Sequence, residues 1–174
     1  MTTSEQLKQY VRDVRDFPQP GIIFRDITPL LARKEIFREV VDMMSKRWTQ
    51  TGPDLVAAIE ARGFIPGAAI AVKLNAGFVP IRKVGKLPWK TISEAYQLEY
   101  GTDQLQIHSD AVEPGQKVLI VDDLLATGGT VQGTIELVER LKGDVIGLAF
   151  LVELEFLHGR DRLDGRRVTS VIRY

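Results

Sequence analysis

Residues 118–130, VLIVDDLLATGGT, decide how this chain folds. Four apolar residues run into two adjacent carboxylates, Asp122 and Asp123, and a glycine-rich turn follows at once. An unbroken apolar run of this kind is typical of a strand that is buried on both faces of a parallel sheet. The next residues, VQGTIELVERLKG (131–143), have helical spacing. The stretch therefore predicts a strand–turn–helix unit with two carboxylates at the carboxyl end of its strand.

The same alternation of apolar runs and helical patterns continues along the chain. Strands are expected around four segments, 55–60, 79–83, 118–122 and 145–152, with another over 168–174. Helical stripes are expected over 35–48 and 67–75. Strands that alternate with helices predict an α/β fold, with a mainly parallel central sheet flanked by helices.

The first 34 residues have a different pattern. A helix is expected from Ser4, with a stripe made of Leu7, Tyr10, Val11 and Val14. FPQPGIIFRDITPLL (17–31) follows, and its prolines and glycine exclude a regular helix over most of it. Because no linker separates this part from the rest, residues 1–174 are expected to form a single domain, in which 1–34 is a helix plus a proline-rich segment.

Composition excludes several classes of protein. Lys+Arg and Asp+Glu both number 23 in 174 residues, so there is no basic excess of the kind that nucleic-acid binding needs. The chain has no cysteine, which rules out disulfides and thiolate chemistry. The polar N-terminus is unlike a signal peptide, and the apolar run 145–152 is too short to span a bilayer as a helix. A soluble, cytoplasmic protein is expected.

The opening stretch has the chemistry of a phosphate and ribose site. Small residues in the turn let backbone N–H groups approach an anion, and the helix N-terminus adds partial positive charge. The Gly-Lys-Ser/Thr ending of a Walker A loop is missing, so a terminal monophosphate fits better than a polyphosphate. Two adjacent carboxylates suit the two hydroxyls of a ribose. The residues expected to bind a ribose 5-phosphate are Asp122, Asp123, Ala126, Thr127, Gly128, Gly129 and Thr130. The alternative is an ordinary strand-to-helix turn.

VLIVDDLLATGGT also resembles the phosphoribosyl-diphosphate (PRPP) motif of type I phosphoribosyltransferases. Four further stretches resemble the adenine-specific branch of that family: FPQPGIIFRDITPLL (17–31), EARGF (60–64), VPIRKVGKLP (79–88) and LEYGTDQLQIH (98–108). They cover nearly the whole chain in the expected order, and the last twenty residues are the least recognisable. The resemblance implies a purine salvage enzyme that converts adenine and PRPP to AMP and diphosphate, with the N-terminal segment as a small hood over the base site.

The resemblance also assigns roles to residues that composition and spacing would not single out. Diphosphate contacts are implied for Glu60, Ala61, Arg62, Arg82, Lys83 and Lys86, with a non-proline cis peptide near Glu60–Ala61. Arg82 and Lys86 would reach the neighbouring subunit's site, so a homodimer is implied. Mg²⁺ would be carried with PRPP, and no metal site made by the protein itself is expected.

Base recognition and catalysis are assigned in the same way. Glu99 matches the carboxylate beside the purine, as general acid/base or as a stabiliser of the protonated base, and Tyr100 matches a loop that covers the reacting centre. Arg62 would help the diphosphate to depart. Adenine contacts are implied for Ile23, Phe24, Arg25 and Ala126.

Two rival functions keep the same PRPP site. One is a phosphoribosyltransferase for another base, such as hypoxanthine, guanine or xanthine, because the phosphate loop does not read the base. The other is a non-catalytic regulator that senses PRPP. The two histidines, His108 and His158, lack metal-ligand spacing and are expected to have surface or packing roles.

Overall fold

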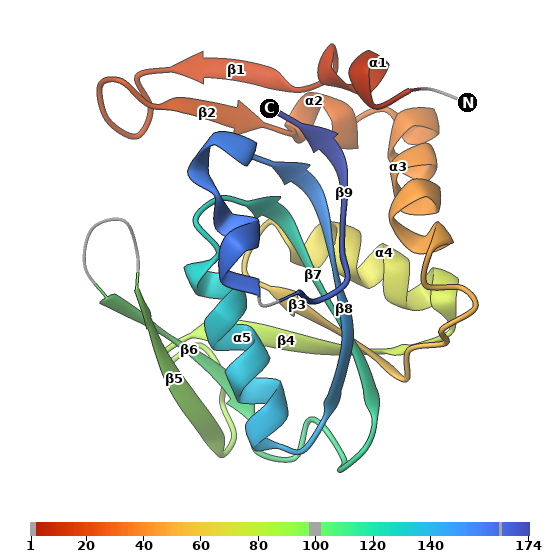
Figure 1. Ribbon diagram of the computed structural model, residues 1–174, viewed down its shortest axis with the longest axis vertical. Helices are drawn as coiled ribbons and strands as arrows, with labels where there is room; N and C mark the ends of the chain where they lie inside the picture. Colours follow the sequence, from red (N-terminus) through yellow and green to blue (C-terminus); the bar gives the residue numbers. More distant parts are fainter. Residues whose placement is uncertain (1–2, 98–101, 164) are drawn as a thin grey trace.

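The computed structural model describes residues 3–97, 102–163 and 165–174, and within them the chain forms a seven-stranded sheet (Figure 1). The strand order is β5-β6-β4-β3-β7-β8-β9. The strands are β3 (Leu55–Ile59), β4 (Gly77–Lys83), β5 (Thr91–Gln97), β6 (Thr102–His108), β7 (Lys117–Leu125), β8 (Asp144–Glu153) and β9 (Val168–Arg173). In this order, β4, β3, β7, β8 and β9 pair in parallel with their neighbours. Strands β5 and β6 form an antiparallel hairpin, and β6 pairs antiparallel with β4. The expected mainly parallel sheet is confirmed.

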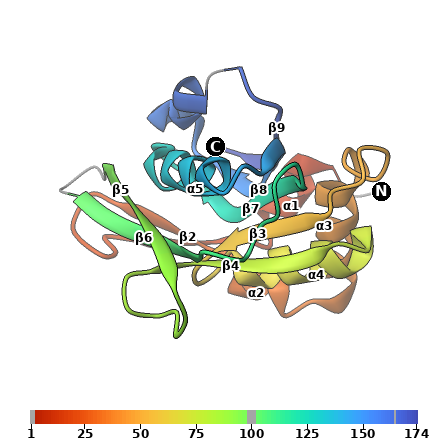
Figure 2. The same cartoon turned by 90° about the horizontal axis from the view of Figure 1, so that it is seen from below.

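Helices cover both faces of this sheet (Figure 2). Helices α3 (Lys34–Lys46) and α4 (Phe64–Leu74) lie on one face, and α5 (Gly129–Arg140) lies on the other. Successive residues of β7 serve the two layers in turn: Val118 and Ile120 pack in the cluster under α5, while Leu119 and Val121 pack in the cluster under α3 and α4. This two-sided burial explains why β7 is an unbroken apolar run.

The N-terminal helix is shorter than its apolar stripe predicts. Helix α1 (Ser4–Lys8) is capped by the Thr3 side chain, and the chain then forms an antiparallel hairpin of β1 (Arg12–Arg15) and β2 (Ile23–Asp26). Helix α2 (Thr28–Leu31) follows. The expectation of a helix as far as Val14 was therefore wrong, because Val14 pairs with Phe24 in the hairpin. A strand pairing to a later segment is invisible to local periodicity.

Strand β7 is longer than expected, and Asp122 and Asp123 lie inside it. Its neighbour β3 pairs with it only as far as Val121, whereas β8 continues to pair as far as Leu125. The prediction that the strand ends at Asp122 was wrong for this reason. The two carboxylates still lie at the carboxyl end of the parallel strands, because they lie beyond the last residue of β7 that pairs with β3.

The C-terminal part adds the last strand of the sheet, β9, beside β8. After β8 the chain forms two short 3-10 helices, η1 (Glu155–Leu157) and η2 (Gly159–Leu163), before it returns as β9. Ser4 of α1 donates a hydrogen bond to the carbonyl of Val171 in β9, which ties the N-terminal segment to the last strand. Among the helices in the described ranges, none is long and apolar enough to cross a membrane.

Candidate active site

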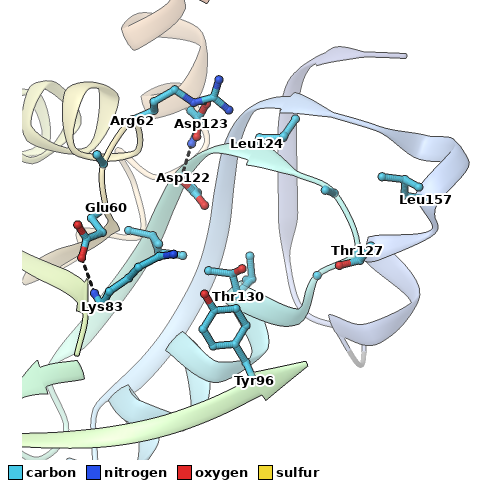
Figure 3. Close-up of a pocket in the computed structure, with 15 residues that line it drawn as sticks. Glu60, Arg62, Lys83, Tyr96, Asp122, Asp123, Leu124, Thr127, Thr130 and Leu157 are labelled. Atoms are coloured by element: carbon cyan, nitrogen blue, oxygen red, sulfur yellow. Dashed lines mark hydrogen bonds and ion pairs between the residues drawn. The ribbon is translucent and has the colours of Figure 1, made fainter. Parts of the chain in front are cut away.

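A cavity of about 410 Å³ opens at the carboxyl ends of β3 and β4, beside the turn from β7 into α5 (Figure 3). This is where ligands bind in open α/β sheets. Its lining residues are Ile59, Glu60, Ala61, Arg62, Lys83, Tyr96, Asp122, Asp123, Leu124, Ala126, Thr127, Gly128, Thr130, Val131 and Leu157. Ten of the residues predicted for the site are among them, from three segments that are far apart in the sequence.

The two carboxylates form one wall of the cavity. Asp122 is 9% exposed and Asp123 is 5% exposed, and the Asp123 N–H donates to Asp122 Oδ1 at 2.8 Å. Arg62 Nε lies 2.7 Å from Asp123 Oδ2 in an ion pair. A side chain at Gly63 would place its Cβ 2.5 Å from Asp122 Oδ1. The glycine of EARG therefore lets the β3–α4 turn approach the carboxylates closely.

Burial makes both carboxylates poor acids. It raises the pKa of Asp122 well above its ordinary value, and the neighbouring charge of Asp123 raises it further. Burial also raises the pKa of Asp123, although the Arg62 guanidinium acts in the opposite direction. Charging this carboxylate pair is therefore costly, and hydroxyl or cationic ligands that pair with it relieve that cost.

Replacing Asp122 by asparagine is expected to stabilise the ligand-free protein at neutral pH. A raised folded-state pKa means that the contribution of Asp122 to stability is fully present below its unfolded pKa and is lost as pH rises through the folded pKa. A gain of about 1 kcal/mol would raise the Tm by about 2–4 °C in a chain of this size. Calorimetry at pH 7.5 and near pH 4 checks this, because the difference from wild type should shrink at the lower pH. An equal difference at both values would contradict the account.

The loop between β7 and α5 forms the second wall. Ala126, Thr127, Gly128 and Thr130 line the cavity, while Gly129 is buried as the first residue of α5. Gly128 has φ +82°, a conformation that favours glycine, and a Cβ there would lie 2.5 Å from the carbonyl oxygen of Gly159. Residues at the N-terminus of α5, Gly128 and Thr130, thus line the cavity, as an anion site requires.

The EAR segment forms the third wall. The peptide bond between Glu60 and Ala61 is cis, as the resemblance implied. Glu60 accepts a hydrogen bond from the backbone N–H of Lys83 and pairs with Arg82 Nη2 at 3.3 Å. Arg82 Nη1 donates to the Lys86 carbonyl at 3.1 Å. Lys83 lines this cavity, whereas Arg82 and Lys86 do not.

The residues predicted to bind adenine lie next to the cavity and, apart from Ala126, do not line it. Arg62 connects them to it: its Cζ is 4.6 Å from the centroid of the Phe24 ring, and its Nη1 lies 3.4 Å from the Arg25 carbonyl oxygen. The Arg25 guanidinium pairs with Asp13 and lies 3.7 Å above the Tyr174 ring. Ile23 is 46% exposed. Strand β2 of the N-terminal segment therefore contacts a residue of the cavity wall, Arg62.

Glu99 and Tyr100 lie outside the described residues. The strand positions on either side of them are described, and there Tyr96 of β5 pairs with Asp103 of β6. Asp103 Oδ2 lies 2.8 Å from Lys83 Nζ and 3.3 Å from the Tyr96 hydroxyl. The hydrogen bond to Asp103 raises the pKa of Lys83, so the ammonium stays charged beside the cavity.

Several lining residues have no signal in the sequence. Tyr96 and Leu124 belong to strands whose register alone brings them to the cavity, and Leu157 comes from η1, in the part of the chain with the weakest resemblance. His158 is 77% exposed and His108 is partly buried, and neither lines the cavity. Within the described ranges, no group of three or more His, Asp or Glu side chains could hold a metal ion.

Comparison with known proteins agrees with this arrangement. A family model, the phosphoribosyl transferase domain, matches residues 26–171. The adenine phosphoribosyltransferase of Thermotoga maritima is 61% identical over 168 residues, which cover 97% of this chain and 97% of that protein. The crystal structure of the Rhodothermus marinus enzyme of the same name superimposes with a TM-score of 0.95 at 51% identity, over 98% of both chains.

A more distant structure contains ligands. Adenine phosphoribosyltransferase from Saccharomyces cerevisiae, complexed with adenine and D-2,5-dideoxy-2,5-imino-altritol 1,6-bisphosphate, superimposes with a TM-score of 0.91 at 35% identity, covering 97% of this chain and 98% of that one. Identity at this level over almost the full length, together with the cavity described above, establishes that the chain belongs to the adenine phosphoribosyltransferase family.

Proposed function

We propose that this chain transfers the 5-phosphoribosyl group of PRPP to adenine in the cavity between β3, β7 and α5, giving AMP and diphosphate. The observation that carries the proposal is that one cavity contains both a buried carboxylate pair, Asp122 and Asp123, and an anion-binding loop at the N-terminus of α5. A sugar phosphate has hydroxyls that suit the carboxylates and a phosphate group that suits the loop. The family relationship supplies the reaction.

We assign the ribose 5-phosphate to these two walls. The 5′-phosphate accepts hydrogen bonds from backbone N–H groups of residues 127–130 and from the hydroxyls of Thr127 and Thr130. The ribose hydroxyls donate to Asp122 and Asp123. Burial supports this role, because a buried carboxylate forms stronger hydrogen bonds than one in water.

We assign the diphosphate to the third wall, beside Glu60, Ala61, Arg62 and Lys83. Arg62 has five N–H donors, and its described contacts use its Nε and Nη1, so further donors are free to neutralise the leaving group. Lys83 adds a second positive charge. As the C1′–O bond breaks, positive charge develops on the ribose ring and negative charge on the diphosphate, and these side chains stabilise the latter.

Magnesium fits this arrangement as an ion that comes with PRPP. Mg²⁺ keeps several waters and is held by one or two carboxylates together with substrate phosphates. Asp122 and Asp123 provide two carboxylates at the ribose side, from which they would contact the ion through water. The ion would neutralise part of the charge on the departing diphosphate.

We place adenine between the phosphate loop and the hood strand β2. Phe24 would stack on the base, the backbone at Ile23 and Arg25 would read its edge, and Ala126 and Leu157 would contribute apolar contacts. Glu99 would exchange the proton of the base and Tyr100 would exclude water, as the family resemblance implies. In this proposal residues 1–174 act as one domain, with residues 1–34 as the hood.

A panel of bases tests the proposed reaction. The purified protein, with Mg²⁺ and PRPP, is offered adenine, hypoxanthine, guanine, xanthine and orotate, and nucleotide formation and diphosphate release are followed. We expect AMP from adenine and no nucleotide from the others. A different preferred base would keep the PRPP site but overturn the adenine assignment. Binding of PRPP without any product would indicate a regulator.

We also propose a cytoplasmic homodimer in which Arg82 and Lys86 contact the diphosphate held by the neighbouring subunit. Two observations support it. Neither residue lines its own cavity, and the loop that carries Lys86 exposes the apolar side chains of Val84 and Trp89, which are 52% and 64% exposed.

Mixed dimers test this sharing of residues. An Arg82→Ala subunit is combined with an inactive subunit that carries Asp122→Asn and Asp123→Asn. Purified heterodimers should have one complete site of two, and therefore about half of wild-type activity. Absence of any rescue in verified heterodimers would contradict shared sites, while each parent homodimer serves as the control.

A further inference from the structure

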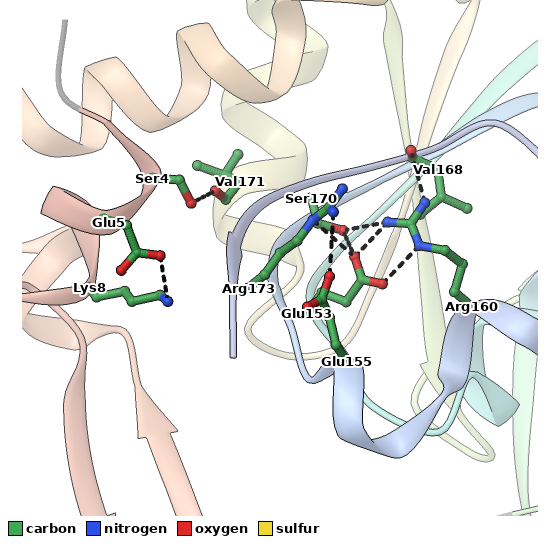
Figure 4. Close-up of polar contacts among 10 residues, drawn as sticks. All are labelled: Ser4, Glu5, Lys8, Glu153, Glu155, Arg160, Val168, Ser170, Val171 and Arg173. Atoms are coloured by element: carbon green, nitrogen blue, oxygen red, sulfur yellow. Dashed lines mark hydrogen bonds and ion pairs between the residues drawn. The ribbon is translucent and has the colours of Figure 1, made fainter.

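An ion pair between Glu153 and Arg160 lies outside the cavity, and Figure 4 shows its contacts with the last strand. Glu153, the last residue of β8, is 3% exposed. Its Oε1 accepts a hydrogen bond from Arg160 Nε at 2.9 Å, and its Oε2 accepts one from Arg160 Nη2 at 2.6 Å. The Ser170 hydroxyl donates to the same Oε2. This is a bidentate Arg–carboxylate contact, the most directional pairing available to these groups.

The pair is charged in the folded protein. Burial acts to raise the pKa of Glu153, but the hydrogen bonds from Arg160 and Ser170 outweigh it and hold the pKa below its ordinary value. Glu153 is buried while the Arg160 side chain is 39% exposed, and an ion pair of this kind is weak support for stability as such, because apolar side chains of similar size often serve as well or better. The geometry of the pair therefore suggests that it fixes the position of the turn that carries Arg160.

Arg160 directly follows Gly159, and Gly159 supports the phosphate loop. A Cβ on Gly159 would lie 2.1 Å from the carbonyl oxygen of Ala126, and a Cβ on Gly128 would lie 2.5 Å from the carbonyl oxygen of Gly159. The two backbones are thus in direct contact, with no room for a side chain between them. A displacement of Gly159 would therefore displace the backbone of Ala126 and Gly128.

The side chain of Arg160 anchors this turn to the sheet. Besides Glu153 of β8, it contacts the Val168 carbonyl and the Ser170 hydroxyl of β9, each at 3.4 Å. The backbone adds one link at the other end of the loop, where the Leu154 N–H donates to the Leu125 carbonyl at 2.9 Å. The last strands are therefore connected to both ends of the segment 125–128.

We propose that Glu153 and Arg160 are positioning residues for PRPP, which fix Gly159 and thereby hold the loop 126–130 in its phosphate-binding conformation. The inference rests on the proposed function, because it requires that this loop binds the 5′-phosphate. It assigns a task to the C-terminal segment, whose sequence gave no functional signal. Neither side chain lines the cavity, so both act through the backbone of Gly159.

Binding of ribose 5-phosphate, measured by calorimetry on the full chain, tests the proposal. Glu153→Gln keeps the size of the side chain but removes the charge, and it should weaken binding about tenfold, since small displacements of a phosphate-binding backbone carry losses of this size. Arg160→Lys keeps the charge but loses the bidentate contact, and a similar loss is expected. Glu5→Gln is the control for the change of charge: Glu5 is exposed, pairs with Lys8 at 2.7 Å, and should bind as wild type does.

A double variant separates positioning from stability. Glu153→Leu combined with Arg160→Met replaces the pair with apolar side chains and should recover a wild-type Tm. Under the proposal it still binds ribose 5-phosphate about tenfold more weakly. A wild-type affinity in this variant, or in Glu153→Gln, would overturn the positioning role. If wild-type protein itself failed to bind ribose 5-phosphate, the proposed site would be wrong as well, so the two failures are distinct.

Steady-state kinetics give a second readout. A displaced phosphate loop should raise the KM for PRPP while kcat at saturating PRPP stays within about twofold of wild type, because the reacting atoms are held by other walls. A fall in kcat with an unchanged KM for PRPP would contradict the proposal.

Discussion

Replacing Asp123 by asparagine is expected to lower the affinity for PRPP by about 10- to 100-fold. Asp123 is 5% exposed and already bears the charge that Arg62 neutralises at 2.7 Å. Hydrogen bonds to a charged group contribute about 1.5–3 kcal/mol, and asparagine keeps the shape but loses the charge. Removing it also releases Arg62 from the position in which it faces the diphosphate. Titration calorimetry with PRPP, in the absence of base, measures the loss directly.

The control for this prediction is Asp110→Asn, an exposed aspartate that does not line the cavity. It should bind PRPP as wild type does. An Asp123→Asn protein with unaltered affinity for PRPP would undo the assignment of the ribose to these carboxylates. Measuring both the Tm and the affinity for PRPP in Asp122→Asn and in Asp123→Asn compares what each carboxylate does for stability and for binding.

Replacing Gly128 by alanine should abolish most binding at the phosphate loop. The residue has φ +82°, where a side chain is strained, and its Cβ would lie 2.5 Å from the Gly159 carbonyl oxygen. Strain of this kind costs about 1–3 kcal/mol, and the contact forces the loop away from η2 in addition. We expect the KM for PRPP to rise by at least about tenfold. Kinetics at varied PRPP, with adenine saturating, measure this change.

Gly115→Ala is the matched control for the backbone. Gly115 has φ +84°, and a Cβ there meets nothing within 4 Å. Both variants should lose a similar amount of stability from the strained φ, but only Gly128→Ala should lose affinity for PRPP. If the two variants bound PRPP equally well, the close contact between Gly128 and Gly159 would have no functional role.

The parts of the fold that local sequence could predict are those with local causes. The apolar run of β7 is buried on both faces, so its identity as a strand is written in consecutive residues. The phosphate loop likewise depends on small residues that follow one another. The cis peptide at Glu60–Ala61 was implied by the family resemblance, because spacing alone does not mark it. The contact of Arg62 with Phe24 was not predicted and is known only from the folded chain.

The parts that could not be predicted depend on contacts between distant segments. Val14 leaves the helical pattern because it pairs with Phe24, and Asp122 lies inside a strand because β8 extends further than β3. Leu157 reaches the cavity only because η1 folds back beside the phosphate loop. Gly159 would have been taken for an ordinary turn glycine, since its close contact with Ala126 exists only in the folded chain.

The measurement that tests the central claim most directly is a crystal structure of the protein with AMP bound. We predict the phosphate within hydrogen-bond distance of the backbone N–H groups of residues 127–130, with the ribose hydroxyls on Asp122 and Asp123. The adenine ring should lie beside Phe24 and Leu157. A phosphate bound instead at residues 60–62, or a ribose that leaves both aspartates without contact, would contradict the proposed site.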